Sequence, residues 1–227
     1  THIRIAGSAV HFMELLFLED YTYAAKKEDH VTDMRKYFDM NKAFNGHSLV
    51  QIVSSRPSEG GDHIRSAYMK MISMATKYIY IQTPYLVRDK GMFDAIRLAA
   101  ASGVDVRIML PMYPDKWFVY YATLQFARRL SKAGAKIYLF NGFLHSKMLV
   151  CDDKVLTIGS ANMDIRSFNL SFEANAFIYS YTHISAQRDQ FITDIASSKK
   201  IDEEYFKNIS PVKRASMPVF ELFSPLL

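Results

Sequence analysis

The residues best suited to chemistry lie in the segment 145–162. His145 and Lys147 are two residues apart, and Ser160 and Asn162 repeat that spacing. Because alternate side chains of an extended chain point to the same face, each pair presents its two groups together. The imidazole can attack or protonate near neutral pH, the ammonium can hold an anionic oxygen, and the hydroxyl and amide can hydrogen-bond to it. The pattern therefore indicates chemistry on a phosphoryl group.

Gly159 stands directly before the second pair. Without a Cβ it lets backbone approach closely, so several donors can gather around one group. Preorganised donors of this kind stabilise the charge that develops on a phosphoryl group during transfer.

The elements that must position these residues follow from apolar spacing. Strands are expected over 49–53, 78–82, 104–110 and 135–140, and they alternate with helices capped by Asp62, Asp89 and Asp115. Three further strands are expected over 147–150, 155–158 and 174–179, followed by a helix from about 183 to 197. This order predicts an α/β fold with a mixed, largely parallel β-sheet flanked by helices on both faces.

The region before the first of these strands is organised differently. Residues 2–6 have the pattern of a short strand, and apolar positions at helical spacing continue to Ala25. A polar connector over 30–45 then leads to the main unit. The chain begins at Thr1, without an initiator methionine and in what reads as a strand, so we expect that an earlier part of the protein precedes it.

Composition narrows the class of protein. The 28 Lys and Arg against 23 Asp and Glu give a net charge of +5, which suits anionic partners such as phospholipid surfaces or nucleic acid. No apolar run approaches the ~20 residues of a membrane-spanning helix. Cys151 is the single cysteine, which excludes an internal disulfide or a thiolate cluster. Without a His-Glu-x-x-His motif either, neither a metal nor a cofactor is expected.

The segment also resembles a known family. His-x-Lys, four residues, Asp152, six residues and Gly-Ser-x-Asn form the HKD motif of the phospholipase D superfamily. The segments 79–85, 102–109, 141–145 and 162–168 are similar to bacterial cardiolipin synthases, and 222–227 resembles the natural end of such enzymes. The resemblance covers nearly the whole chain.

This resemblance implies a domain organisation. The chain resembles the C-terminal half of a two-lobe enzyme with a phospholipase D-like fold. Residues 1–29 would be the end of the preceding lobe and 30–45 the connector. Residues 46–200 would form a catalytic lobe with one HKD motif, and 201–227 a C-terminal tail.

The family also implies a division of labour between histidines. Its members bring two motifs together at a shared site, where one histidine attacks phosphorus and the other protonates the departing alcohol. This chain has one motif, since no other histidine is followed two positions later by lysine. His145 matches the motif that usually supplies the general acid and then the general base, although the sequence leaves open which histidine attacks.

The other motif positions carry roles by the same resemblance. Lys147, Ser160 and Asn162 match positions that hold the phosphate. Glu173 matches an acidic residue that hydrogen-bonds a catalytic imidazole. Asp152 is expected to orient the local backbone or the motif side chains.

Three tyrosines are candidates for a lipid headgroup pocket: Tyr85, Tyr120 and Tyr121. Aromatic residues beside strands and helix starts are as often part of the core. The sequence gives no reason to prefer one interpretation for these residues.

The function implied by the resemblance is phosphatidyl transfer between two phosphatidylglycerol molecules, which yields cardiolipin and glycerol through a phosphohistidine. Two alternatives stay open: a phosphodiesterase that acts as a dimer on lipid or nucleic acid, and a catalytically silent half that binds only a headgroup or its partner. Expected partners are anionic phospholipid, the membrane surface, and a first half or a second copy of the chain, while nucleic acid is disfavoured. The family places the full enzyme at the bacterial cytoplasmic membrane.

Overall fold

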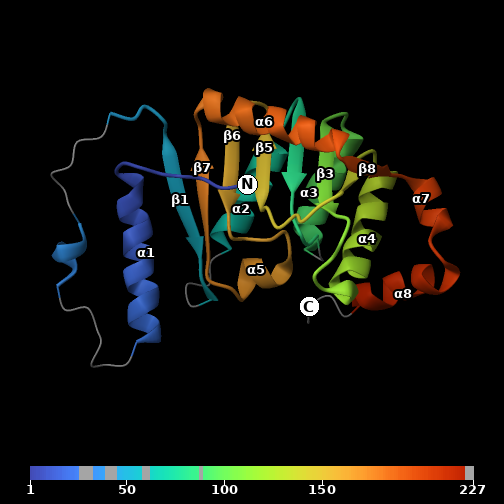
Figure 1. Ribbon diagram of the computed structural model, residues 1–227, viewed down its shortest axis with the longest axis horizontal. Helices are drawn as coiled ribbons and strands as arrows, with labels where there is room; N and C mark the ends of the chain where they lie inside the picture. The colour runs from blue at the N-terminus through green and yellow to red at the C-terminus, as the bar shows by residue number, and fades with distance from the viewer. Residues whose placement is uncertain (26–32, 39–44, 58–61, 87–88, 223–227) are drawn as a thin grey trace.

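The apolar strands assemble into one eight-stranded sheet with the order β1-β7-β6-β5-β2-β3-β4-β8 (Figure 1). The computed structural model describes residues 1–25, 33–38, 45–57, 62–86 and 89–222. The strands are β1 (Val50–Ser55), β2 (Tyr78–Gln82), β3 (Asp105–Pro111), β4 (Lys136–Phe140), β5 (Met148–Cys151), β6 (Val155–Gly159), β7 (Glu173–Ile178) and β8 (Ser198–Ile201).

The mixed sheet with helices on both faces is confirmed, but its expected largely parallel character is wrong. Only the β2–β3 and β3–β4 pairs are parallel, and the five others are antiparallel. Parallel neighbours need a crossover connection, usually a helix, whereas antiparallel neighbours can be joined by a tight turn. Helices separate β2, β3 and β4 along the chain, but only a short turn separates β5 from β6.

The helices divide between the two faces of the sheet. α2 (His63–Ser73), α3 (Lys90–Ala101) and α4 (Trp117–Lys132) pack against Ile79, Ile81 and their neighbours. α6 (Tyr181–Ala196) packs against the opposite face through Ile184 and Phe191, where Tyr78 and Tyr80 point. Successive strand residues thus serve two separate apolar cores.

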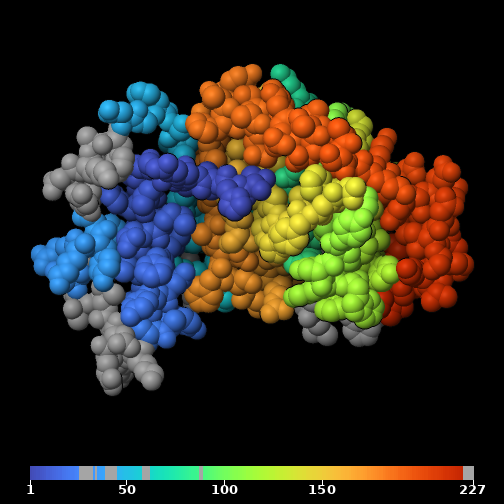
Figure 2. Space-filling model, viewed as in Figure 1, coloured from blue at the N-terminus to red at the C-terminus, as the bar shows by residue number. Residues whose placement is uncertain are grey.

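The ends of the molecule carry the remaining helices. α1 (Ala9–Ala24) lies beside β1, whereas α7 (Glu203–Asn208) and α8 (Pro211–Leu222) lie at the other end of the long axis (Figures 1 and 2). A short 3-10 helix spans Met34–Tyr37, and α5 (Ile165–Asn169) connects β6 to β7. No helix within the described ranges is both long and apolar enough to cross a bilayer.

The N-terminal segment departs from the prediction. Residues 2–6 form no strand, because a strand needs a hydrogen-bonded neighbour and the free side of β1 faces α1 instead. The helix predicted to reach Ala25 is present and ends at Ala24, but only Leu18 is buried on it. Parts of the predicted connector, 30–32 and 39–44, and the last residues of the tail, 223–227, lie outside the described residues.

Candidate active site

The motif residues gather at one edge of the sheet, where β2, β3 and β4 end. His145 and Lys147 lie on the segment that runs from β4 into β5, and Ser160 and Asn162 directly follow β6. Glu173 begins β7. Because β5 and β7 run against β2 whereas β6 runs along it, the start of the first two and the end of the third meet at the same edge.

His145 and Lys147 are in direct contact. The ammonium Nζ lies 2.7 Å from His145 Nδ1 and 3.5 Å from Nε2, and it donates to the His145 carbonyl oxygen at 2.9 Å. An imidazole nitrogen that accepts from an ammonium carries no proton itself, so Nε2 is the protonated nitrogen of a neutral ring in this arrangement. The expected convergence of the two side chains is therefore present.

Both groups have lowered pKa values. Partial desolvation lowers the pKa of His145, the charge of Lys147 lowers it further, and Asp115 opposes the shift. Desolvation also lowers the pKa of Lys147, against the opposing charges of Glu173, Asp115 and Asp164. At pH 7 the imidazole is therefore neutral, and the ammonium lies within electrostatic reach of three carboxylates.

Substitution of Lys147 by methionine should raise the pKa of His145. The change removes the neighbouring charge but keeps a side chain of similar length, so the value should stay below the ordinary 6.5 because desolvation remains. Titration of the imidazole carbon-bound protons by NMR measures the shift. Lys154→Met, at the turn between β5 and β6, is the matched control and should leave the value unchanged; an equal shift in both variants would contradict the assignment.

The segment that carries Ser160 and Asn162 is held by a buried amide. Asn175, which is 1% exposed, accepts from the Ala161 backbone N–H at 3.3 Å through Oδ1. Its Nδ2 donates to the Tyr68 hydroxyl at 2.7 Å and to Thr157 Oγ1 at 3.0 Å. The residue between the two candidate phosphate ligands is thereby fixed to the core.

Gly159 is required by this amide. A Cβ at this position would lie 2.1 Å from Asn175 Oδ1 and 2.5 Å from the Ala174 carbonyl oxygen. The sequence predicts close backbone approach at Gly159, and the groups that come close are the Asn175 side chain and the Ala174 carbonyl oxygen. Ser160 also lies against β7, because its Oγ accepts a hydrogen bond from the Ala174 backbone N–H at 3.0 Å.

Gly159→Ala should therefore destabilise the protein by about 1–3 kcal/mol, the usual cost of forcing extra atoms into a packed core. Urea unfolding measures the change in the free energy of unfolding. Gly46→Ala is the control, since a Cβ there would meet no atom within 4 Å. If the two variants were equally stable, Asn175 would be able to move away from the added Cβ without loss of stability, which would contradict the prediction.

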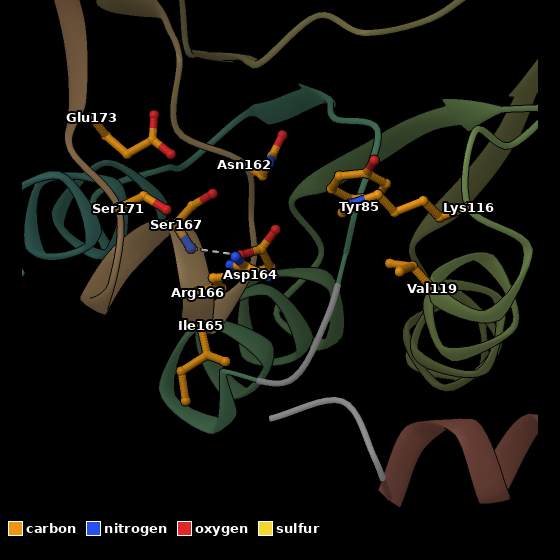
Figure 3. Close-up of a pocket in the computed structure, with 10 residues that line it drawn as sticks. All are labelled: Tyr85, Lys116, Val119, Asn162, Asp164, Ile165, Arg166, Ser167, Ser171 and Glu173. Carbon is orange, nitrogen blue, oxygen red and sulfur yellow. Dashed lines mark hydrogen bonds between the residues drawn. The ribbon is translucent and has the colours of Figure 1, made fainter. Parts of the chain in front are cut away.

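A pocket of about 190 Å³ opens beside these residues (Figure 3). Tyr85, Asn162 and Glu173 line it, together with a set that carried no role in the sequence interpretation: Lys116, Val119, Asp164, Ile165, Arg166, Ser167 and Ser171. In Figure 3, Asn162 lies between Glu173 and Ser171 on one side and Tyr85 and Lys116 on the other. Asn162 Oδ1 is buried and has no hydrogen-bond partner among the described residues. This oxygen can only accept, so the donor that Asn162 could offer a phosphoryl oxygen is the Nδ2 of the same amide.

Two carboxyl groups face this pocket with raised pKa values. Burial raises the pKa of Glu173, which Ser160 and Ser167 lower by hydrogen bonding and Asp164 raises by its charge. Burial also raises the pKa of Asp164, against hydrogen bonds from Ser167. Asp164 caps α5 by accepting from the Ser167 backbone N–H at 2.7 Å. The Asp-x-x-Ser spacing before this helix was the available signal for Asp164.

The tyrosines separate in the structure. Tyr85 lines the pocket and its hydroxyl donates to Asp115. Asp115 was expected to cap α4, but Lys116 occupies the N-cap position instead. Tyr121 stacks on Phe220 of α8, and Tyr120 interacts with Tyr205, so neither lines the pocket. The C-terminal helices occupy their side of α4, and the headgroup interpretation of Tyr120 and Tyr121 stays a prediction.

Asp152 lies at the opposite end of β5 from Lys147. Its carboxylate accepts from Thr76 N at 2.7 Å, Thr76 Oγ1 at 2.9 Å, Lys77 N at 2.9 Å and Tyr78 N at 2.8 Å. These bonds fix the start of β2. Asp152 thus orients backbone, as one part of the prediction had it, but it does not join the catalytic group.

Within the described ranges, no group of three or more His, Cys, Asp or Glu residues is arranged to hold a metal ion. Cys151 is buried on β5 and its thiol contacts the Met71 carbonyl oxygen at 3.4 Å. Burial raises the pKa of this thiol to about 12, which removes it from nucleophilic chemistry near neutral pH.

The chain is similar to known cardiolipin synthases over its whole length. The chain is 41% identical over its whole length to a cardiolipin synthase of Listeria monocytogenes and 44% identical to one of Staphylococcus aureus. It spans 47% and 46% of those proteins, about half of their length.

Solved structures show the same fold. A phosphatidylserine synthase of Haemophilus influenzae matches with a TM-score of 0.61 and 17% identity, over 78% of this chain and 48% of that one. Nuc of Salmonella typhimurium, a phospholipase D family member, matches with a TM-score of 0.59 and 17% identity, over 69% of this chain and 99% of that one. These likenesses confirm the phospholipase D-like fold. Residues 68–195 match the family described as cardiolipin synthase, PLD-like domain, and the chain therefore belongs to that family.

Proposed function

We propose that this chain supplies half of the active site of a phosphatidyltransferase that joins two phosphatidylglycerol molecules into cardiolipin. The observation that carries the proposal is the contact of His145 with Lys147 at the sheet edge where Asn162 lines a pocket. Membership of the family supports the same reaction. The relatives that match are twice as long, which supports a site completed by a second phospholipase D-like half.

The reaction takes place in two displacements. In the first, a histidine of the other half attacks phosphorus, the bond from phosphorus to the glycerol oxygen breaks, and His145 gives that oxygen a proton. In the second, His145 takes the proton of a hydroxyl on another phosphatidylglycerol. The hydroxyl oxygen then forms a bond to phosphorus as the phosphohistidine bond breaks, and the histidine of the other half is released unchanged.

Lys147, Ser160 and Asn162 hold the phosphoryl oxygens in this proposal. An arriving anionic phosphoryl group attracts the Lys147 ammonium away from His145 Nδ1, because a phosphate oxygen is a stronger acceptor for a cation than a neutral imidazole. Removal of that charge raises the pKa of His145 and favours the protonated ring that a general acid requires. Among the described residues Glu173 makes no hydrogen bond to His145 and instead accepts hydrogen bonds from Ser160 and Ser167. We therefore assign it to the imidazole contributed by the other half.

Exposed aromatic side chains support a membrane surface as partner. Phe143 is 85% exposed, and its ring stacks on the His145 ring with centroids 6.0 Å apart. Tyr113, between β3 and α4, is 66% exposed, and Trp117, the first residue of α4, is 61% exposed. Tryptophan and tyrosine favour the interface between membrane and water. The full enzyme is accordingly assigned to the bacterial cytoplasmic membrane, with anionic phospholipid at its surface.

A product assay tests the function. Phosphatidylglycerol vesicles are incubated with this chain alone and with the chain joined to a first phospholipase D-like half, and lipids are identified by mass spectrometry. The expected products are cardiolipin and glycerol in equal amounts. Phosphatidic acid instead would show a hydrolase, and no product from the joined protein would show a silent half; either result contradicts the proposal.

A further inference from the structure

Ala161, between two of the candidate phosphate ligands, is held at both of its peptide groups. Its backbone N–H donates to Asn175 Oδ1 at 3.3 Å, and its carbonyl oxygen accepts from the Tyr68 hydroxyl at 3.5 Å, a long hydrogen bond. Asn175 Nδ2 donates to the same hydroxyl at 2.7 Å. These three bonds form a closed ring that joins α2 and β7 to the segment after β6.

The chemistry of the groups fixes the direction of each bond in this ring. A backbone N–H can only donate, so the amide oxygen of Asn175 must face Ala161. The Asn175 Nδ2 then has one proton for the Tyr68 hydroxyl and one for Thr157 Oγ1, at 3.0 Å. Without the Tyr68 hydroxyl, a buried Nδ2 proton would have no acceptor, which favours another orientation of the amide.

The ring lies in the core of the protein. Tyr68, Asn175 and Ala161 are each 1% exposed. Burial raises the pKa of Tyr68, and although the hydrogen bond from Asn175 opposes this shift, the charge of Glu173 adds to it. The hydroxyl therefore stays protonated near neutral pH and can donate to the Ala161 carbonyl.

The ring limits how far Ser160 and Asn162 can move. Because a peptide group is planar, the bond to the Ala161 N–H restrains the plane that starts at Ser160. The bond to the Ala161 carbonyl restrains the plane that ends at Asn162. A group that is already held in its binding direction loses less entropy when a ligand arrives, so the ring should strengthen the binding of an anion.

We infer that Tyr68 and Asn175 are positioning residues of the phosphate site, which act through Ala161 and set the affinity of Ser160 and Asn162 for a phosphoryl group. Neither residue belongs to the motif segment 145–162, and both act from the core. The inference rests on the proposed function for the ligand that Ser160 and Asn162 hold.

Tyr68→Phe tests the inference, because it removes the hydroxyl and keeps the aromatic ring. Binding of inorganic phosphate to the chain is measured by NMR from the amide shifts of Ser160 and Asn162. The dissociation constant should rise about fivefold, the effect expected for the loss of one hydrogen bond. Urea unfolding establishes that the variant is folded at the temperature of the measurement.

Tyr78→Phe is the matched control. It also removes a hydroxyl that donates at 2.7 Å, in this case to Asp153, but Tyr78 begins β2 and therefore lies at the edge of the sheet opposite the site. It should lose stability without a change in phosphate affinity. Equal phosphate affinity of Tyr68→Phe and Tyr78→Phe would overturn the inference.

Hydrogen exchange of the Ala161 amide separates positioning from a general loss of stability. In Tyr68→Phe this amide should exchange several times faster than in Tyr78→Phe, because the Asn175 amide that holds it is no longer fixed. Equal exchange of the Ala161 amide in the two variants would contradict the role of the ring.

The inference and the proposed function fail in different ways. If phosphate does not change the amide shifts of Ser160 and Asn162 in the parent chain, the phosphate site is refuted, and the proposed function with it. If the parent chain binds phosphate and Tyr68→Phe binds it equally well, the proposed function stands and only the positioning role fails.

Discussion

Replacement of His145 by alanine in the enzyme with both halves is expected to lower cardiolipin formation by roughly two to four orders of magnitude. A positioned general acid and base contributes about 10²–10⁴-fold to a reaction rate. The proposed mechanism uses His145 as the acid of the first displacement and the base of the second, so the variant should slow both steps. Mass-spectrometric quantification of cardiolipin from phosphatidylglycerol vesicles measures the loss.

The control for this variant is His183→Ala. His183 is an exposed histidine on α6, and its Nδ1 contacts Ser180 Oγ at 3.0 Å, so its removal tests the general effect of losing an imidazole. It should retain nearly full activity. If the activity of His145→Ala stayed within a few-fold of the parent enzyme, His145 would not be the general acid and base, because loss of such a group lowers the rate by about 10²–10⁴-fold.

Asp152→Ala is expected to lower the free energy of unfolding by about 3–5 kcal/mol while leaving the residues of the site in place. The carboxylate accepts four hydrogen bonds from the segment 76–78, and the Asp152 side chain is 1% exposed. Its loss leaves the buried Tyr78 N–H without an acceptor, at about 1–3 kcal/mol, and removes the three hydrogen bonds from the exposed residues Thr76 and Lys77, at about 0.5–1.5 kcal/mol each. Urea unfolding measures the change.

Lys154→Ala is the matched control for Asp152. Lys154 lies 3.9 Å from the same carboxylate but is 66% exposed, so its ion pair contributes at most about 1 kcal/mol. A loss of stability in Lys154→Ala as large as in Asp152→Ala would show that charge pairing, and not the hydrogen bonds to the backbone, carries the effect.

The contribution of Asp152 should also depend on pH. Burial alone would raise the pKa of this carboxyl group, but the hydrogen bonds from Tyr78, Thr76 and Lys77 outweigh burial and lower it below the ordinary 3.8. A group with a lowered pKa stabilises the fold fully above its unfolded pKa and loses that effect as the pH falls through its folded pKa. The stability difference between the parent and Asp152→Ala should therefore be constant near neutral pH and shrink below about pH 3.8.

The sequence by itself determined the parts of the protein that depend on neighbours along the chain. The strand over 78–82 and the cap at Asp89 occur where apolar spacing and capping preference predicted them. The same holds for the contact between His145 and Lys147, because alternation in an extended segment is a local property. The motif spacing was enough to identify the family.

Only the tertiary structure decided which distant residues share the site. Asp152 belongs to the motif by spacing, yet β5 carries it to the far end of the sheet, since a strand of four residues separates it from Lys147. Tyr85 and Tyr121 looked equivalent in the sequence, but α8 covers one and leaves the other at the pocket. The antiparallel pairing of most strands, which brings Glu173 beside Asn162, depends on contacts between segments that no local pattern encodes.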